Sequence, residues 1–191
     1  MNFGDLFERN ERCFGDHTAV LFEKRTLTHR ELAHRAHRLV NALAARGCAR
    51  QDRIAILSRN CPEYLEVYAA AGIGGLGGRG LNYRPSGPEQ AAILQDAQPG
   101  VFVFEAEYLD RIDELRANLP EGTLYVCFDR EPEASGWFIG YESLLAEGQP
   151  GPVALRARDD DTFLLIYTSG TTGVPKGVML GNAAQLEQAR T

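Results

Sequence analysis

The sequence predicts an α/β protein built on a mostly parallel sheet flanked by helices. Short apolar stretches rich in β-branched and aromatic residues recur along the chain, as in buried strands. Between them lie longer stretches in which apolar residues recur every three or four positions, as in helices. This alternation favours parallel strands joined by crossover helices. With 191 residues, of which 44% are hydrophobic and 24% charged, the chain is long enough for one sizeable core.

The first predicted unit is a pair of short strands around a charged turn at 18–28, followed by a helix. Thr28 and Glu31 match the S/T-x-x-E pattern of a capping box, in which each side chain binds the other residue's backbone N–H. Gly47 is placed to end this helix. Its apolar positions recur at helical spacing and are Leu32, Ala36, Leu39, Val40 and Leu43.

The elements that follow keep the alternation. Strands are predicted at 53–57, 101–104, 123–128, 162–167 and 177–180, and helices at 62–72, 87–97, 108–119 and 141–148. Asn182, with Gln185 three residues later, can cap a last helix. The chain turns polar and rich in Pro and Gly around 148–161. We therefore expect an N-terminal α/β subdomain at 1–158, and a strand–phosphate loop–strand unit with the final helix at 159–191.

A glycine-rich segment at 72–80 matches the dinucleotide fingerprint G-x-G-x-x-G through Gly72, Gly74 and Gly77. That fingerprint requires a strand before it and a helix after it. Here a predicted helix precedes the segment and a loop-like stretch follows, so dinucleotide binding is disfavoured. Because glycine weakens strands, we expect a flexible or poorly formed strand at this place.

Two polar clusters raise the question of a metal site. His34 and His37 lie three residues apart on the first long helix, but nearby cations repel a metal ion, and we expect a solvated polar face. The cations are Arg30, Arg35 and Arg38. The acidic run at 159–161 also suggests a metal site, but a solvated loop before a strand is the preferred interpretation.

The strongest functional signal is the run TSGTTGVPKG at 168–177, which lies between two predicted strands. Its glycines permit backbone angles that turn successive N–H groups toward one concavity, and its hydroxyls add donors for anionic oxygens. Lys176 supplies a point charge for a polyphosphate, and Pro175 stiffens the approach to it. A plain hairpin with a polar tip does not explain this combination. The run is not a Walker A loop, because that motif requires Gly before its lysine and Ser or Thr after it.

The segment YTSGTTGVPKGVML at 167–180 resembles the phosphate-binding loop of the adenylate-forming superfamily, which comprises the acyl-CoA synthetases and their relatives. The resemblance covers residues 1–191 as part of an AMP-binding domain, through LTHRELAHRAHRLVNALAARG, DRIAILSRNCPEYLEVYAAAG and LNYRPSGPEQAAILQDAQPGVFVFE. It implies the N-terminal part of that superfamily's large α/β domain. The phosphate-contacting residues it implies are Thr168, Ser169, Gly170, Thr171, Thr172, Gly173 and Lys176, with Thr168 on the side of the Mg²⁺ ion.

The resemblance also implies a two-step reaction. A carboxylate attacks the α-phosphate of ATP, giving an acyl-adenylate and pyrophosphate, and a thiol, usually coenzyme A, then takes the acyl group. The loop would hold the β- and γ-phosphates and, with Mg²⁺, neutralise charge on the leaving pyrophosphate. Lys176 would act as an electrostatic clamp and not as a base.

The chain departs from the superfamily pattern at three places. A serine–histidine pair usually follows the loop and its strand, whereas this chain has Gly181 and Asn182. The sequence GGRG at 77–80 stands where relatives carry an apolar strand, and the charge of Arg79 opposes burial there. The later motifs, including the catalytic lysine of the mobile C-terminal domain, are not among these 191 residues. We therefore predict no catalytic residue in this chain and expect an N-terminal ligase fragment that is inactive alone.

Composition and net charge limit the kinds of partner and the cellular location expected for this protein. The net charge of −6 gives no support to nucleic-acid binding, and four scattered cysteines favour reduced thiols over a disulfide or zinc framework. No signal peptide and no membrane span are predicted, so we expect a cytoplasmic protein.

A partial domain should leave apolar surface uncovered, which favours self-association. The alternative function is therefore a non-catalytic nucleotide- or partner-binding module. A kinase-like phosphotransferase is disfavoured, because neither a Walker-type lysine nor a catalytic Asp/Asn loop is present.

Overall fold

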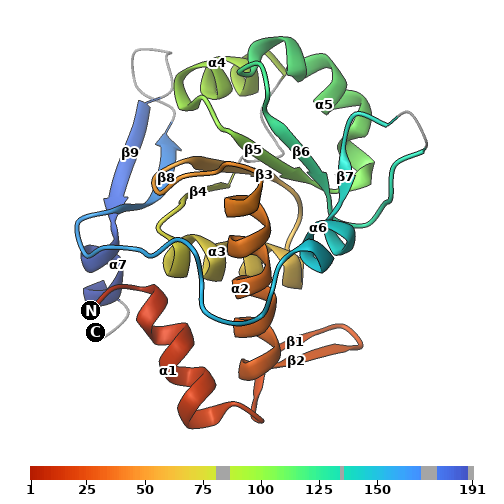
Figure 1. Ribbon diagram of the computed structural model, residues 1–191. Coiled ribbons are helices and arrows are strands. Elements are labelled where there is room, and N and C mark those ends of the chain that lie inside the picture. The colour runs from red at the N-terminus through yellow and green to blue at the C-terminus, as the bar shows by residue number, and fades with distance from the viewer. Residues whose placement is uncertain (81–86, 134–135, 169–175, 189–191) are drawn as a thin grey trace.

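A seven-stranded sheet with helices on both faces forms the body of the molecule (Figure 1). The computed structural model describes residues 1–80, 87–133, 136–168 and 176–188. Strands lie in the order β7-β6-β5-β3-β4-β8-β9, and all neighbours are parallel except β8 and β9. The predicted fold class, a mostly parallel sheet flanked by helices, is confirmed.

The strands of the large sheet are β3 (Arg53–Leu57), β4 (Gly77–Gly80), β5 (Val101–Phe104), β6 (Leu124–Cys127), β7 (Ile139–Gly140), β8 (Thr162–Thr168) and β9 (Lys176–Gly181). A separate antiparallel pair is formed by β1 (Thr18–Phe22) and β2 (Arg25–Thr28). The helices are α1 (Gly4–Phe14), α2 (His29–Ala45), α3 (Pro62–Gly74), α4 (Gly87–Ala97), α5 (Leu109–Leu115), α6 (Tyr141–Glu147) and α7 (Asn182–Gln188).

Two apolar cores lie on opposite faces of the sheet, because successive strand residues point to opposite sides. Ile54 and Ile56 of β3 pack with α2, α3 and α6, whereas Ala55 and Leu57 pack with α4 and α5. β5 follows the same rule, with its valines in the first core and its phenylalanines in the second. Figure 1 shows α4 and α5 above the sheet and α2, α3 and α6 below it. The continuous apolar strands of the sequence are therefore strands covered on both faces.

The capping box at the start of α2 is confirmed. Glu31 N–H donates to Thr28 Oγ1 at 3.2 Å, and Thr28 N–H donates to Glu31 Oε2 at 2.7 Å. The Glu31 carboxylate accepts hydrogen bonds from Thr28 N–H and from the Thr28 hydroxyl at 2.9 Å, and these two bonds hold the pKa of Glu31 below its ordinary value. Two other expectations need correction. Helix α1 was not predicted, and the helix expected at 108–119 ends at Leu115 and continues as a 3₁₀ turn at Arg116–Asn118.

The glycine-rich segment is a helix end followed by a sound strand. Gly74 packs against Val40, and Gly75, with φ of +72°, ends α3 by donating to the Ala71 carbonyl. β4 then pairs with β3 on one side and β8 on the other. The expectation of a poorly formed strand was wrong, since β4 pairs on both sides and Gly78 lies against Ala71 of α3 and against Phe163 and Leu164 of β8. The side chain of Arg79 lies outside the described part of the structure.

The polar clusters are held in ion pairs and hydrogen bonds and are not simply solvated. His37 is buried and its Nδ1 lies 3.2 Å from the Pro150 carbonyl, while His34 Nε2 lies 3.1 Å from Glu11 Oε1. Asp161 is also buried and pairs with Arg50. The prediction of solvated surfaces was therefore wrong for His37 and Asp161, because the chain segment 148–161 and helix α1 pack onto these positions.

Candidate functional site

The hairpin formed by β8 and β9 carries the predicted phosphate-binding residues. The antiparallel register places Thr168 directly opposite Lys176, at the point where the two strands meet the connecting loop. Both residues are exposed. The other five predicted residues lie outside the described part of the structure: Ser169, Gly170, Thr171, Thr172 and Gly173. The structure therefore brings one hydroxyl and one cation together at the neck of the hairpin, and the roles of all seven residues stay predictions.

Tyr167 fixes this neck to the helical layer above it. Its hydroxyl donates to the Asp96 carboxylate near the end of α4, and its ring lies over Gly177 of β9. A Cβ atom at position 177 would come within 2.8 Å of the Tyr167 ring. Glycine at 177 therefore allows Tyr167 to cross the hairpin and reach α4. Tyr167 was predicted only as a strand residue. The feature that could have indicated its role is an aromatic side chain with a polar end that pairs with glycine across the hairpin.

The base of the hairpin is fixed by one partly buried and one fully buried polar side chain, Gln51 and Asn182. Gln51 accepts a hydrogen bond from Thr162 N–H at 2.9 Å, and its amide nitrogen donates to the Gly75 carbonyl at 2.9 Å. Asn182, at the end of β9, is fully buried and its N–H donates to the Asp161 carbonyl at 2.8 Å. Asn182 does begin α7, as the sequence predicts, but its side-chain oxygen accepts from Phe3 N–H.

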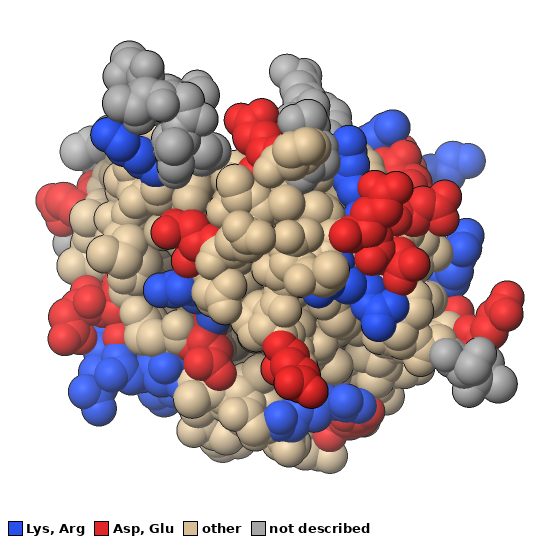
Figure 2. All heavy atoms as spheres, turned by 90° about the horizontal axis from the view of Figure 1, so that it is seen from above, with Lys and Arg blue, Asp and Glu red and all other residues tan. Residues whose placement is uncertain are grey.

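Around the hairpin, the described residues form no metal-binding cluster. No group of three His, Cys, Asp or Glu side chains suited to a metal ion occurs among the residues that the structure describes. Figure 2 looks down on the α4–α5 layer, where acidic and basic side chains are interspersed and form no continuous positive patch. Within the same described residues, no helix has the length and apolarity needed to cross a membrane.

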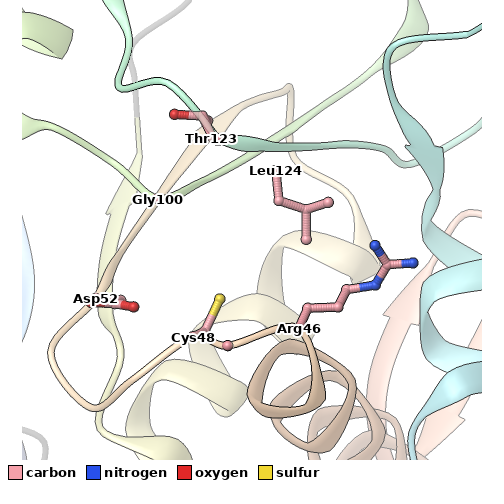
Figure 3. Close-up of a pocket in the computed structure, with 8 residues that line it drawn as sticks. Arg46, Cys48, Asp52, Gly100, Thr123 and Leu124 are labelled. Carbon is pink, nitrogen blue, oxygen red and sulfur yellow. The ribbon is translucent and has the colours of Figure 1, made fainter.

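A separate concavity of about 460 Å³ lies between the end of α2 and the starts of β3, β5 and β6 (Figure 3). The Cys48 thiol and the Leu124 side chain point into it. Burial and the nearby Asp52 carboxylate raise the pKa of the Cys48 thiol, so the reactive thiolate is scarce near neutral pH. Open α/β sheets bind ligands at the carboxyl ends of their strands, which is where the loop after β8 begins. The cavity of Cys48 is therefore not the candidate site.

Comparison with known proteins finds relatives that match nearly the whole chain. The family model of the AMP-binding enzymes matches residues 7–191. An indoleacetate–CoA ligase from Aromatoleum aromaticum is 37% identical over 186 residues, which cover 96% of this chain and 36% of that protein. The chain thus spans about a third of that relative's length.

Solved structures give the same result. A structure described as a putative long-chain-fatty-acid CoA ligase from Rhodopseudomonas palustris has a TM-score of 0.89 and 29% identity, covering 100% of this chain and 47% of that one. An anthranilate–CoA ligase in complex with anthranoyl-AMP has a TM-score of 0.91 and 25% identity, covering 100% of this chain and 36% of that one. The chain therefore belongs to the AMP-binding family of adenylate-forming enzymes and corresponds to the N-terminal part of their fold.

Proposed function

We propose that this chain is the N-terminal part of an ATP-dependent carboxylate–CoA ligase and that its β8–β9 hairpin binds the polyphosphate of ATP. The observation that carries the proposal is the pairing of Thr168 with Lys176 at the exposed neck of the hairpin. A hydroxyl and an ammonium group placed opposite each other suit an extended chain of anionic oxygens. The relatives described above are CoA ligases, which supports the same assignment.

The proposed reaction proceeds in two steps. A carboxylate oxygen attacks the α-phosphorus of ATP and displaces pyrophosphate, and the thiol of coenzyme A then attacks the acyl carbon and displaces AMP. Lys176 would offset negative charge on the departing pyrophosphate, and the Thr168 hydroxyl would help to hold the Mg²⁺ ion that shares this task. The chain supplies binding and charge compensation and holds no catalytic base for the attack.

The acid is proposed only as a class, because the three relatives are named for indoleacetate, anthranilate and long-chain fatty acids. Each is a monocarboxylic acid with a large apolar part. We infer that the complete ligase takes an acid of this class, and these three acids form the panel for activity measurements.

The proposal is tested by calorimetric titration of MgATP into the chain. Replacing Lys176 by Ala should weaken binding about 10- to 100-fold, which is the range for losing one charged hydrogen bond to phosphate. The chain has one other lysine, Lys24, in the turn between β1 and β2. Lys24→Ala removes the same charge far from the hairpin along the chain and should bind MgATP like the wild type. Equal affinity of Lys176→Ala and wild type would refute the assignment.

The alternative, a non-catalytic binding module that self-associates, is favoured by one observation. Val178 and Met179 of β9 are 45% and 68% exposed, and Ile166 of β8 is 46% exposed. Val178 pairs with Ile166 and Met179 with Leu165, so apolar side chains lie on both faces of the hairpin.

Sedimentation velocity across a hundredfold range of concentration tests this alternative. We expect reversible association of the wild type, abolished in the double variant Val178→Ser, Met179→Ser and retained in Leu21→Ser. Leu21 is 75% exposed on β1 and serves as the control. A wild type that stays monomeric throughout would contradict self-association.

A further inference from the structure

The first residues of the chain are fastened to the base of the β8–β9 hairpin. Phe3 N–H donates to the side-chain oxygen of Asn182 at 2.7 Å, and the Asn2 amide donates to the Ala157 carbonyl at 3.3 Å. Asn182 is fully buried although it lies 179 positions away along the sequence. A buried acceptor that binds a distant backbone N–H fixes the relative position of the two segments.

The same asparagine connects the two ends of the hairpin. Asp161 directly precedes β8 and Asn182 directly follows β9, and Asn182 N–H donates to the Asp161 carbonyl at 2.8 Å. The Asp161 carboxylate is itself held by Arg50 and by the N–H of Arg158. Asn182 therefore stands where the N-terminal segment and both strands of the hairpin meet.

Packing leaves the N-terminal segment little freedom. The ring of Phe3 lies 4.6 Å from that of Phe163, between ring centres, and Phe163 is only 2% exposed. Gly4 touches the backbone of Gly72 and Ile73 at the end of α3 so closely that a Cβ would collide with it. The contact through Asn182 is thus backed by the aromatic core and by α3.

The hairpin depends on this contact because its own attachment to the sheet is short. β8 aligns with β4 at one residue pair, Gly78 with Leu164, within the described residues, and β9 pairs with β8 at the end of the sheet. Tyr167 holds the neck to α4, and Asn182 holds the base. Attachment at the base, where Gln51 also holds Thr162, and at the neck limits rotation of the hairpin about β8, and so fixes where Thr168 and Lys176 lie.

We propose that Asn182 is a positioning residue, which with Phe3 fixes the base of the hairpin and thereby sets the place of Thr168 and Lys176 for polyphosphate binding. This rests on the proposed function of the hairpin. The role belongs to the acceptor oxygen, since the amide nitrogen of Asn182 has no hydrogen-bond partner among the described residues. Asp at this position keeps an acceptor, whereas Leu has similar size and no acceptor.

The test compares Asn182→Leu with Asn182→Asp by hydrogen exchange of the β9 amides and by MgATP titration. Loss of the acceptor leaves Phe3 N–H without its partner, so Asn182→Leu should speed β9 exchange and weaken MgATP binding, each about tenfold. Asn182→Asp should recover part of both losses. The matched control is Tyr141→Phe, which removes a buried hydrogen bond to Glu66 far from the hairpin along the chain. It should lower global stability without changing either readout.

Two results would overturn the proposal. One is β9 exchange in Asn182→Leu equal to that of the wild type; the other is a loss of MgATP affinity in Tyr141→Phe as large as that in Asn182→Leu. If Asn182→Leu does not fold, Asn2→Ala, which removes the hydrogen bond to the Ala157 carbonyl and the acceptor of Asp5 N–H, should shift both readouts in the same direction by a smaller factor. If the wild type fails to bind MgATP, the proposed function is wrong, while β9 exchange still decides whether Asn182 holds the hairpin.

Discussion

The centre of the sheet and its β8–β9 end are both apolar in sequence but differ in how they are stabilised. Phe102 and Phe104 of β5 are fully buried, whereas Ile166, Val178 and Met179 of the hairpin are 46%, 45% and 68% exposed. The central strands are held by two apolar cores. The hairpin is held by polar contacts at its base and at its neck. Apolar strand sequences therefore predict strands at both places, but in the hairpin Phe163 is buried while Ile166, Val178 and Met179 stay exposed, so the sequence pattern alone does not predict burial there.

The largest difference between the two regions should appear on truncating an apolar side chain. Phe102→Ala leaves a cavity between the sheet and the α4–α5 layer and should lower the free energy of unfolding by about 3–5 kcal/mol. Ile166→Ala removes a half-exposed side chain and should cost less than about 1 kcal/mol. Urea denaturation followed by circular dichroism measures both values. A loss for Ile166→Ala as large as that for Phe102→Ala would show that the hairpin is as well packed as the centre.

The centre of the molecule also contains buried polar contacts, made by Glu66 of α3. These contacts provide a second comparison with the hairpin. Glu66 is fully buried, and its carboxylate binds Arg35 at 2.7 Å and the Tyr141 hydroxyl at 3.0 Å. Burial raises the pKa of Glu66 above its ordinary value of 4.5, although Arg35 opposes the shift. The folded state then binds more protons than the unfolded state, so this residue's contribution to stability is full below pH 4.5 and falls as the pH rises through the folded pKa.

Glu66→Gln removes this titration. At pH 4 it should cost about 2 kcal/mol in the free energy of unfolding, and the difference from wild type should narrow as the pH rises. Glu142→Gln, which removes the exposed partner of Arg35 but keeps Glu66, is the control and should still lose stability as the pH rises. Urea titrations at pH 4, 5, 6 and 7 measure the slope. A difference that widens with pH would reverse the assigned pKa shift.

The smallest effect is expected at the start of α2, which lies away from both regions. Thr28→Ala deletes the acceptor of the capping box and should cost about 1 kcal/mol in the free energy of unfolding. Thr26→Ala on the exposed side of β2 removes the same hydroxyl without a cap and should be nearly neutral. Thermal denaturation of the two variants provides the measurement, and equal melting temperatures would argue against a stabilising cap.

Local patterns in the sequence predicted most of the fold. The capping box of Thr28 and Glu31 and the strand at 53–57 depend on neighbouring residues alone, and both are confirmed. Long-range contacts were not predictable in this way. Burial of Asp161 depends on Arg50, which is 111 residues away, and the role of Asn182 depends on Phe3. Sequence spacing cannot show such pairs, because each member is an ordinary polar residue in its own segment. The division of the chain at 158–159 stays a prediction.

The most direct test of the account is carboxylate-dependent exchange between ATP and pyrophosphate. We expect the hairpin to bind MgATP, and we expect that these residues alone do not activate a carboxylate. Samples shown to bind MgATP should therefore give no exchange above the protein-free background with indoleacetate, anthranilate or a long-chain fatty acid. Exchange above background that Lys176→Ala abolishes would contradict this, and would show that the 191 residues complete the adenylation step by themselves.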